Sequence, residues 1–267
     1  MLKVAIGEYD TGWQDPEGSL ARAVELIEKR ARAGARLVVL PETSPSGFTM
    51  SSDYAEPQDG KSMQAFAAAA RNNEVYVLAG IATRRNNKCY NTAVLFGPDG
   101  MINAAYDKQK LFSYAGEDRV FSAGSDPVIF DIDGVRATVF ICYDLRFPLL
   151  FKEVCPYADL VLIIANWPEQ RDKHWQVLTQ ARAIENQVYV IAVNRCGEGG
   201  GLRYKGGASV AFQPCGEPAP RSDDSCNIVM VDPGKVSEVR AGFPVAGNQS
   251  EAESPFGPFP RSWRASR

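Results

Sequence analysis

Apolar and polar positions alternate along the first half of the chain with two different periods. Spacing of three and four residues predicts helices over 19–33 and 62–73, with Gly34 ending the first. Short apolar runs bounded by turn residues predict strands. The Pro-Asp-Gly turn at 98–100 predicts that the last two of these strands form a hairpin. The predicted strands cover 2–7, 37–40, 75–83, 92–97 and 101–106.

The second half repeats this plan. Helices are expected from about residue 148 and about residue 173, between strands at 128–132, 135–142, 160–165, 188–193, 208–213 and 226–231. Two half-chains of similar plan predict an α/β fold in which two sheets pack face to face with helices outside, an αββα sandwich. We expect one domain over 1–242. Residues 243–267, rich in Pro, Ser and Gly, are expected to be a tail that is mobile or docked on a partner subunit.

Composition directs the search toward small-molecule chemistry. The 267 residues are 45% hydrophobic, and the formal net charge is -3. Such a chain can bury a sizeable core, and it lacks the clustered basic residues that nucleic acid or anionic lipid would require. No apolar run approaches the roughly 20 residues that span a bilayer. Residues 1–7 indicate a strand and not a secretory leader, so we expect a cytoplasmic protein with no nucleic-acid or membrane partner.

The counts of histidine and cysteine remove several mechanisms. His174 is the only histidine, which excludes a metal site built from two or three imidazoles. It falls in a predicted helix, so a carboxylate is the better candidate for a general base. The six cysteines occur singly, which argues against disulfides and against a thiolate zinc site. We therefore expect neither a metal nor another cofactor.

Cys142 is the candidate nucleophile. It ends an apolar strand, and Pro148 follows where the first turn of a helix is expected. Backbone N–H groups at such a turn can lower the pKa of a thiol and can bind an oxyanion. A buried structural cysteine at a strand end is the alternative, and the strand alone does not decide between them.

Two further ionisable residues also follow predicted strands. Glu42 comes directly after the strand 37–40 and Pro41, at the kind of sheet edge where active residues gather, and it could serve as a general base. A capping or surface carboxylate is the plain alternative. Lys108 follows the strand 101–106, and its spacing alone would not separate it from the solvated lysines of the chain.

Together these segments resemble the nitrilase, or carbon-nitrogen hydrolase, superfamily. The resemblance runs from about residue 4 to 231, and its signatures occur in order as Leu40–Glu42, Tyr106–Lys108 ahead of Leu111 and Phe112, and Ile141–Pro148. The resemblance implies the αββα fold, a Glu42–Lys108–Cys142 triad, and hydrolysis of a non-peptide amide or nitrile without a cofactor. It also implies a second glutamate after the lysine, a place that Glu117 fits, and a homodimer or higher homo-oligomer.

Within the superfamily the chain looks most like the omega-amidases. The similarity lies in 165–168, 174–175 and 181–187. It implies that the substrate is the terminal amide of a small 2-oxo acid, such as 2-oxoglutaramate or 2-oxosuccinamate, cleaved through a Cys thioester with release of ammonia. Lys110 and Ala208 stand where the family usually has histidines, which leaves the identity of the substrate open.

Several residues are candidates for oxyanion and substrate contacts. The backbone N–H of Tyr143 would join Lys108 in binding the oxyanion. Further contacts with the small-molecule amide are expected from Phe48, Tyr143, Asn166 and Trp167, each of which could equally be a packing residue. For a substrate carboxylate, the glycine-rich loop 197–207 offers Arg203 and Lys205, whereas we expect Arg146 to form a structural ion pair.

Two other kinds of function stay open. The same triad would serve a nitrilase or an N-carbamoyl amino acid hydrolase, which the products would distinguish. A non-catalytic interaction protein on this scaffold, or a redox-responsive thiol protein, belongs to a different class. The presence of Glu42, Lys108 and Cys142 argues against the former, and the lack of a second cysteine close in sequence argues against the latter.

Overall fold

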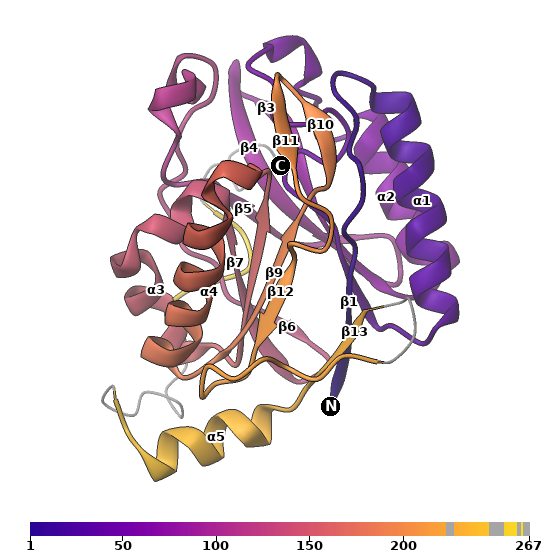
Figure 1. Ribbon diagram of the computed structural model, residues 1–267. Coiled ribbons are helices and arrows are strands. Elements are labelled where there is room, and N and C mark those ends of the chain that lie inside the picture. The colour runs from indigo at the N-terminus through magenta and orange to yellow at the C-terminus, as the bar shows by residue number, and fades with distance from the viewer. Residues whose placement is uncertain (223–226, 246–253, 261–262, 264–267) are drawn as a thin grey trace.

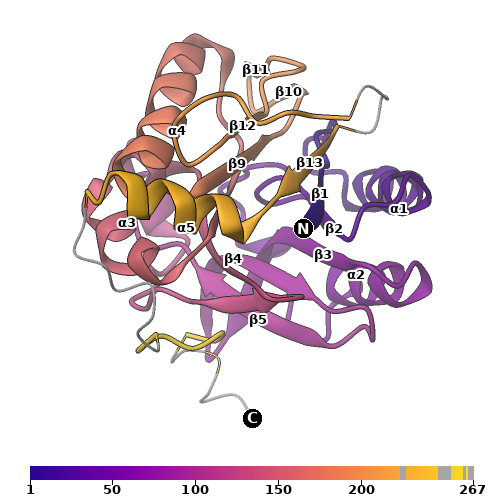
Figure 2. The ribbon, with the colours of Figure 1, turned by 90° about the horizontal axis from the view of Figure 1, so that it is seen from below.

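Two β-sheets lie face to face, and helices cover their outer faces (Figures 1 and 2). The computed structural model describes residues 1–222, 227–245, 254–260 and 263. In Figure 2, α1 and α2 lie on one side of the two sheets, and α3 and α4 lie on the other. The predicted α/β sandwich with two mixed sheets is confirmed. In the described ranges, no helix is long and apolar enough to cross a bilayer.

The first sheet has six strands in the order β13-β1-β2-β3-β4-β5. The strands β1, β2 and β3 run parallel, while β13, β4 and β5 pair antiparallel with their neighbours. Glu42 follows β2 and Lys108 follows β5, so this sheet supplies two of the three predicted catalytic side chains. The bounds are β1 Leu2–Ile6, β2 Leu37–Val39, β3 Tyr76–Arg85, β4 Lys88–Phe96, β5 Ile102–Asp107 and β13 Ile228–Val231.

The second sheet has five strands in the order β12-β9-β8-β7-β6. Its centre, β7, β8 and β9, is parallel, and the two outer strands pair antiparallel. A separate hairpin, β10–β11, leaves the end of β9. The bounds are β6 Phe130–Ile132, β7 Val135–Ile141, β8 Leu160–Ala165, β9 Tyr189–Asn194, β10 Gly197–Gly199, β11 Leu202–Tyr204 and β12 Val210–Phe212.

Local sequence signals explain where the longest helix begins and ends. The Asp15 side chain caps the N-terminus of α1 by accepting the Gly18 N–H at 3.0 Å, and Pro16 occupies the first turn. Three basic residues in its last turn suit the negative end of the helix dipole. The helices are α1 Pro16–Arg32, α2 Lys61–Asn72, α3 Pro148–Val154, α4 Asp172–Asn186 and α5 Pro233–Gly242, with short 3-10 turns η1 Ser52–Tyr54, η2 Ser113–Ala115, η3 Glu117–Arg119, η4 Cys142–Arg146, η5 Cys155–Tyr157 and η6 Glu169–Arg171.

The apolar core forms on both faces of the first sheet. Along β3, Leu78 faces the second sheet, while Val77 and Ala79 face α1 and α2. This alternation is the period of two that a strand imposes on its side chains. Fully burying one side chain such as Leu78 contributes about 1.5–3 kcal/mol, so the two apolar layers fix how the sheets stack and where their strands end.

Three features depart from the simple picture of one sheet per half-chain. The strand β13 comes from the end of the domain yet pairs with β1, where it covers an edge that would otherwise expose backbone hydrogen-bonding groups. The glycine-rich loop contains the β10–β11 hairpin. Within the predicted tail, residues 254–260 pack on their own chain, with the Ala105 N–H donating to the Pro258 carbonyl at 3.0 Å. Residues 246–253, 261–262 and 264–267 lie outside the described residues.

Candidate active site

Side chains that follow four strands meet at one end of the two facing sheets. Glu42 follows β2 and Lys108 follows β5 in the first sheet, while Cys142 follows β7 and Asn166 follows β8 in the second. The carboxyl ends of parallel strands are where open α/β sheets gather their active residues. Stacking two sheets therefore brings a carboxylate, an ammonium group and a thiol into one place.

Three charged side chains at this end are completely buried. Lys108 Nζ donates to Glu42 Oε1 at 2.9 Å and to both carboxylate oxygens of Glu117 at 3.0 and 2.9 Å. The Phe112 N–H donates to Glu117 Oε2 at 2.6 Å. A buried charge is costly unless it is paired and hydrogen-bonded, and here each charged group has both kinds of partner. We call Glu42, Lys108, Glu117 and Cys142 the floor.

Two asparagines fix the Glu42 carboxylate. Asn91 Nδ2 donates to Glu42 Oε1 at 2.8 Å and to Glu117 Oε1 at 3.0 Å, so it bridges the two glutamates. The Asn166 N–H donates to Glu42 Oε2 at 2.8 Å, and its side chain donates to the Glu42 carbonyl at 2.7 Å. Gly80 makes room, because a Cβ there would lie 2.5 Å from the Glu42 Cα. The carboxylate is thereby held in one orientation.

The burial of the floor shifts the pKa values of its lysine and its thiol. For Lys108, desolvation opposes the positive charge, but Glu117 and Glu42 outweigh it and raise the pKa, so the side chain is an ammonium ion. For Cys142, burial raises the pKa well above its ordinary value, and the negative charge of Glu42 adds to the increase. The thiol is therefore protonated at rest. A net lowering of this pKa, which the turn suggested, is not found, because desolvation is the larger effect.

Cys142 occupies a sharp turn between β7 and η4. Its φ is +46°, a left-handed conformation that is uncommon for residues other than glycine. Such strain persists only where the surrounding structure holds it. The N–H of Tyr143 lies in the first turn of η4, where backbone donors lack helical partners. This N–H is available to an anion bound beside the sulfur.

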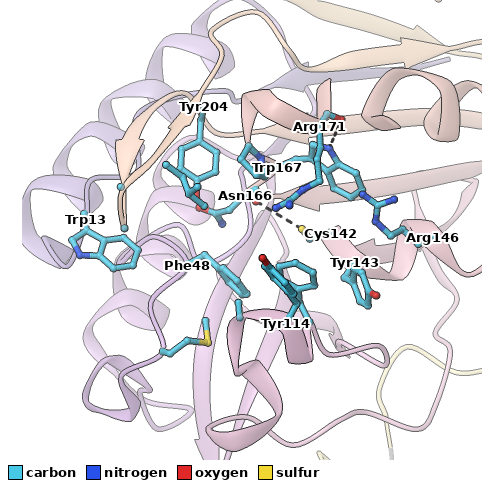
Figure 3. Close-up of a pocket in the computed structure, with 17 residues that line it drawn as sticks. Trp13, Phe48, Tyr114, Cys142, Tyr143, Arg146, Asn166, Trp167, Arg171 and Tyr204 are labelled. Carbon is cyan, nitrogen blue, oxygen red and sulfur yellow. Dashed lines mark hydrogen bonds between the residues drawn. The ribbon is translucent and has the colours of Figure 1, made fainter. Parts of the chain in front are cut away.

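A cavity of about 670 Å³ opens above the thiol (Figure 3). Seven of its described lining residues are aromatic, and the two charged ones are Arg146 and Arg171. We call these two arginines and Trp167 the wall. Lining residues are Trp13, Phe48, Met50, Phe112, Tyr114, Ala115, Cys142, Tyr143, Arg146, Asn166, Trp167, Pro168, Arg171, Gly199, Gly200, Leu202 and Tyr204.

The arginines of the wall rest on aromatic rings. The Arg146 guanidinium lies 4.6 Å from the Trp167 ring centroid, and that of Arg171 lies 5.5 Å from the Phe112 ring centroid. The predicted ion pair of Arg146 was wrong: within the described residues, neither arginine has a carboxylate within 4.0 Å. Figure 3 shows both beside Trp167, on the opposite side of Cys142 from Trp13.

The basic residues expected from the glycine-rich loop are engaged elsewhere. Arg203 is exposed and lies 3.7 Å from Glu198 and 3.9 Å from Glu169, and Lys205 lies 3.5 Å from Asp172. Neither belongs to the described lining of the cavity, so this expectation was wrong. The hairpin turns their side chains outward, and the loop contributes Gly199, Gly200, Leu202 and Tyr204 instead.

The other substrate-contact candidates reach the cavity in different ways. The Phe48 ring centroid lies 5.0 Å from Lys108 Nζ, so this ring covers the ammonium group. Tyr143 packs against Phe112 and Phe147, with ring centroids 4.9 and 5.3 Å away. Trp167 is buried, and its indole N–H donates to the Arg171 carbonyl at 2.8 Å. Asn166 also lines the cavity, in addition to holding Glu42.

The two positions where the family usually has histidine are not in the described lining. Lys110 directs its ammonium group over the Phe147 ring, 5.5 Å from the centroid. Ala208 is buried, and its carbonyl accepts the Trp175 indole N–H at 2.8 Å. Neither residue therefore contacts the space above Cys142 directly.

Several site residues were missed from the sequence. Asn91 lies inside β4 but one residue before the strand predicted over 92–97, so the apolar pattern did not mark it. Trp13 and Tyr204 come from the loop after β1 and from the hairpin, and Arg195 Nη2 joins these two segments through Asp10 Oδ1 at 2.6 Å. A Cβ on Gly200 would lie 2.7 Å from the Trp13 ring, so glycine permits this contact. Among the described residues, no three His, Cys, Asp or Glu side chains are grouped as a metal site would need.

The fold and the floor define a carbon-nitrogen hydrolase, and the chain belongs to that family, whose pattern matches residues 3–241. It is 34% identical to the 2-oxoglutaramate amidase of Bacillus subtilis over 89% of this chain and 93% of that protein. It is 35% identical to the omega-amidase YafV of Escherichia coli K12, over 81% of this chain and 83% of that protein. It is 30% identical to the omega-amidase NIT2 of Mus musculus, over 85% of this chain and 87% of that protein.

A solved structure agrees with this assignment. A carbon-nitrogen hydrolase superfamily protein from Xanthomonas campestris, which carries an arsenic adduct in its active site, superposes with a TM-score of 0.82. It shares 32% sequence identity, over 91% of this chain and 95% of that one. The protein is therefore a hydrolase that acts on carbon-nitrogen bonds other than peptide bonds.

Proposed function

We propose that the protein is an omega-amidase that hydrolyses the terminal amide of a small 2-oxo acid and releases ammonia. One arrangement supports this proposal above all: a buried carboxylate and ammonium group and the thiol of Cys142 lie below a cavity lined by two arginines that, within the described residues, have no carboxylate partner. The floor suits amide hydrolysis, and the wall suits an anionic substrate. The names of the relatives from Bacillus subtilis and Escherichia coli point to the same substrates.

The proposed reaction begins with proton transfer from Cys142 to Glu42 as the sulfur attacks the amide carbon. The carbonyl oxygen becomes an oxyanion, held by Lys108 and by the Tyr143 N–H. Removing one such donor costs about 2.7–4 kcal/mol in an enzyme where this was measured. Glu42 then gives its proton to the nitrogen, the C–N bond breaks, and ammonia leaves. A thioester of Cys142 remains.

In the second half of the reaction, Glu42 takes a proton from water, and the resulting hydroxide attacks the thioester. The carbon–sulfur bond breaks, and the thiolate of Cys142 takes the proton that Glu42 holds. The new carboxylic acid gives its proton to solvent and leaves as the dicarboxylate product. Lys108 remains protonated throughout, as its raised pKa requires. Glu117 keeps Lys108 in place through its two short contacts. A covalent intermediate divides one difficult displacement into two easier steps.

The proposed binding mode assigns the two ends of the substrate to different groups. Arginine forms forked hydrogen bonds that match a carboxylate, so Arg146 and Arg171 would receive the 2-oxo acid end. The scissile amide would lie over Cys142. Asn166 Oδ1 is buried and has no hydrogen-bond partner among the described residues, so it can accept an N–H of the substrate amide. Phe48, Tyr143 and Trp167 would enclose the carbon chain.

A product screen tests the proposal. Purified protein is incubated with 2-oxoglutaramate, 2-oxosuccinamate, glutamine, simple aliphatic amides, nitriles and N-carbamoyl amino acids, and ammonia and carbon dioxide are measured. We expect ammonia without carbon dioxide, fastest from the two 2-oxo acid amides. Turnover confined to nitriles, or equimolar carbon dioxide from carbamoyl compounds, would identify one of the alternative hydrolases. No turnover of any amide would favour a non-catalytic protein.

We further propose that the protein is a cytoplasmic homodimer or higher homo-oligomer. Leu149, Val177 and Ile184 are exposed on α3 and α4, and apolar patches of this kind often mark subunit contacts. Light scattering after size-exclusion chromatography measures the assembly, and a monomer at micromolar concentration would contradict this part. The five cysteines in the described residues are unpaired, as is usual in a reducing compartment.

A further inference from the structure

A buried carboxylate beside the floor accepts hydrogen bonds from two segments of the chain. Asp144 is completely buried in η4. Its Oδ2 accepts the Ile141 N–H at 3.0 Å and the Tyr106 hydroxyl at 2.9 Å, and its Oδ1 accepts the Lys110 N–H at 2.8 Å. Within the described residues, no lysine or arginine lies within ion-pair distance of it. Three hydrogen bonds therefore support a carboxylate that has no cationic partner in contact.

The first of these bonds encloses the nucleophile. Ile141 precedes Cys142 and Asp144 follows two residues later, so the side chain reaches back across the turn that contains the thiol. Cys142 itself has a left-handed backbone, with φ of +46°, and such a conformation persists only where the surrounding structure holds it. The bond from the Ile141 N–H to Asp144 spans the turn that also contains the Tyr143 N–H.

The other two bonds enclose the lysine of the floor. Tyr106 lies two residues before Lys108 and Lys110 lies two residues after it, and both donate to the Asp144 carboxylate. Tyr106 lies in β5 of the first sheet and Lys110 follows that strand, whereas Asp144 follows β7 in the second sheet. One side chain thus connects the segment that carries the ammonium group to the segment that carries the thiol.

We propose that Asp144 is a positioning residue that sets the separation between Lys108 and the Cys142–Tyr143 turn, and hence the alignment of the two oxyanion donors. Asp144 is not in the described lining of the cavity, so it acts through these neighbours and not on the substrate. The carboxylate is needed because all three partners are donors. An asparagine would present its own N–H₂ group to at least one of them, leaving two donors facing each other.

The test compares Asp144→Asn with a matched control, Asp159→Asn. Asp159 is also buried and accepts three hydrogen bonds from Arg136, but it lies before β8, at the other end of the parallel strands from the floor. Each preparation is normalised to the fraction of Cys142 that iodoacetamide alkylates, measured by mass spectrometry of the peptide that carries Cys142, because Cys215 is also exposed. Misplacement by about 1 Å can cost about 100-fold in rate. We expect kcat for 2-oxoglutaramate to fall about 30- to 100-fold in Asp144→Asn with KM within threefold, and kcat of the control to stay within twofold.

A second variant keeps the proposal testable if Asp144→Asn does not fold. Tyr106→Phe removes one of the three donors and leaves the carboxylate and its two backbone bonds, so we expect kcat to fall three- to tenfold with KM unchanged. Unchanged kcat per alkylated Cys142 in either folded variant, or a rise in KM with kcat unchanged, would overturn the proposal. The assay rests on the proposed amidase function. Ammonia release by the wild-type protein tests that function by itself, whereas the kcat of each variant relative to the wild-type protein tests the role of Asp144.

Discussion

The floor and the wall of the cavity differ in how their charges are satisfied. On the floor, Lys108 is fully buried between Glu42 and Glu117, and each carboxylate oxygen of these glutamates accepts at least one hydrogen bond. On the wall, Arg146 and Arg171 are partly exposed, contact aromatic rings, and lack carboxylate partners among the described residues. The charged groups of the floor are already paired with one another, whereas the arginines of the wall are open to bind an anion. Reaction chemistry and substrate choice are thus assigned to different sets of residues.

The largest expected effect comes from the nucleophile. Cys142→Ala removes the only atom that can form the thioester, so we expect ammonia release to fall by at least about 10⁴-fold, as when other nucleophiles are removed. Far-ultraviolet circular dichroism should be unchanged. Cys215→Ala, a change at an exposed cysteine away from the floor, is the matched control and should retain full activity. Appreciable turnover by Cys142→Ala would exclude the thioester mechanism.

Replacing the lysine of the floor tests how much its charge contributes to stability as well as to activity. Lys108→Met leaves Glu42 and Glu117 buried without their shared cation, and breaking a buried ion pair on one side costs about 3–5 kcal/mol. We expect the free energy of unfolding in urea to fall by that amount, together with loss of activity. The exposed pair of Arg32 and Glu28 provides a control, since Arg32→Met should change stability by less than about 1 kcal/mol. Equal effects of the two substitutions would mean that the floor is less buried than the structure indicates.

The wall should respond through substrate affinity. Arg171→Gln or Arg146→Gln removes a charged hydrogen bond worth about 1.5–3 kcal/mol, so KM for 2-oxoglutaramate should rise by roughly tenfold to 100-fold with little change in kcat. Arg203→Gln, at the exposed arginine outside the cavity, should leave KM unaltered. If the two wall variants lose kcat but retain KM, the distinction between floor and wall is wrong.

The smallest expected effect concerns pH. Burial raises the pKa of Asp144 to about 6, although the Ile141 and Lys110 N–H groups, the charge of Lys108 and the Tyr106 hydroxyl all act to lower it. Below this pH the carboxylate becomes protonated and loses acceptor capacity, so kcat should decline as the pH falls through about 6. Tyr106→Phe removes one lowering contribution and should move this decline to higher pH. A shift in the opposite direction would contradict the assignment of the acid limb to Asp144.

Much of the fold and the order of the catalytic residues could be predicted from the sequence. Apolar periodicity located the main strands and helices because each element must present one continuous face to a core. Glu42, Lys108 and Cys142 could each be placed at the end of a strand, but only the resemblance to the carbon-nitrogen hydrolase signatures separated them from ordinary residues at strand ends. Their shared location then follows from how parallel strands stack. The sequence also indicated Glu117, but not that it holds Lys108 through both oxygens.

Only the tertiary structure decided which polar side chains outside the strands face the cavity. Arg203 and Lys205 were expected in the cavity, but they point outward from a hairpin that local sequence did not reveal. Arg146 and Arg171 line the cavity instead. Likewise, Asp144 lies within a motif that the sequence displays, yet its donor at Lys110 is 34 residues away and follows a strand of the other sheet. The direction of a loop side chain depends on how the two sheets pack, and packing sums many weak apolar contacts distributed along the whole chain.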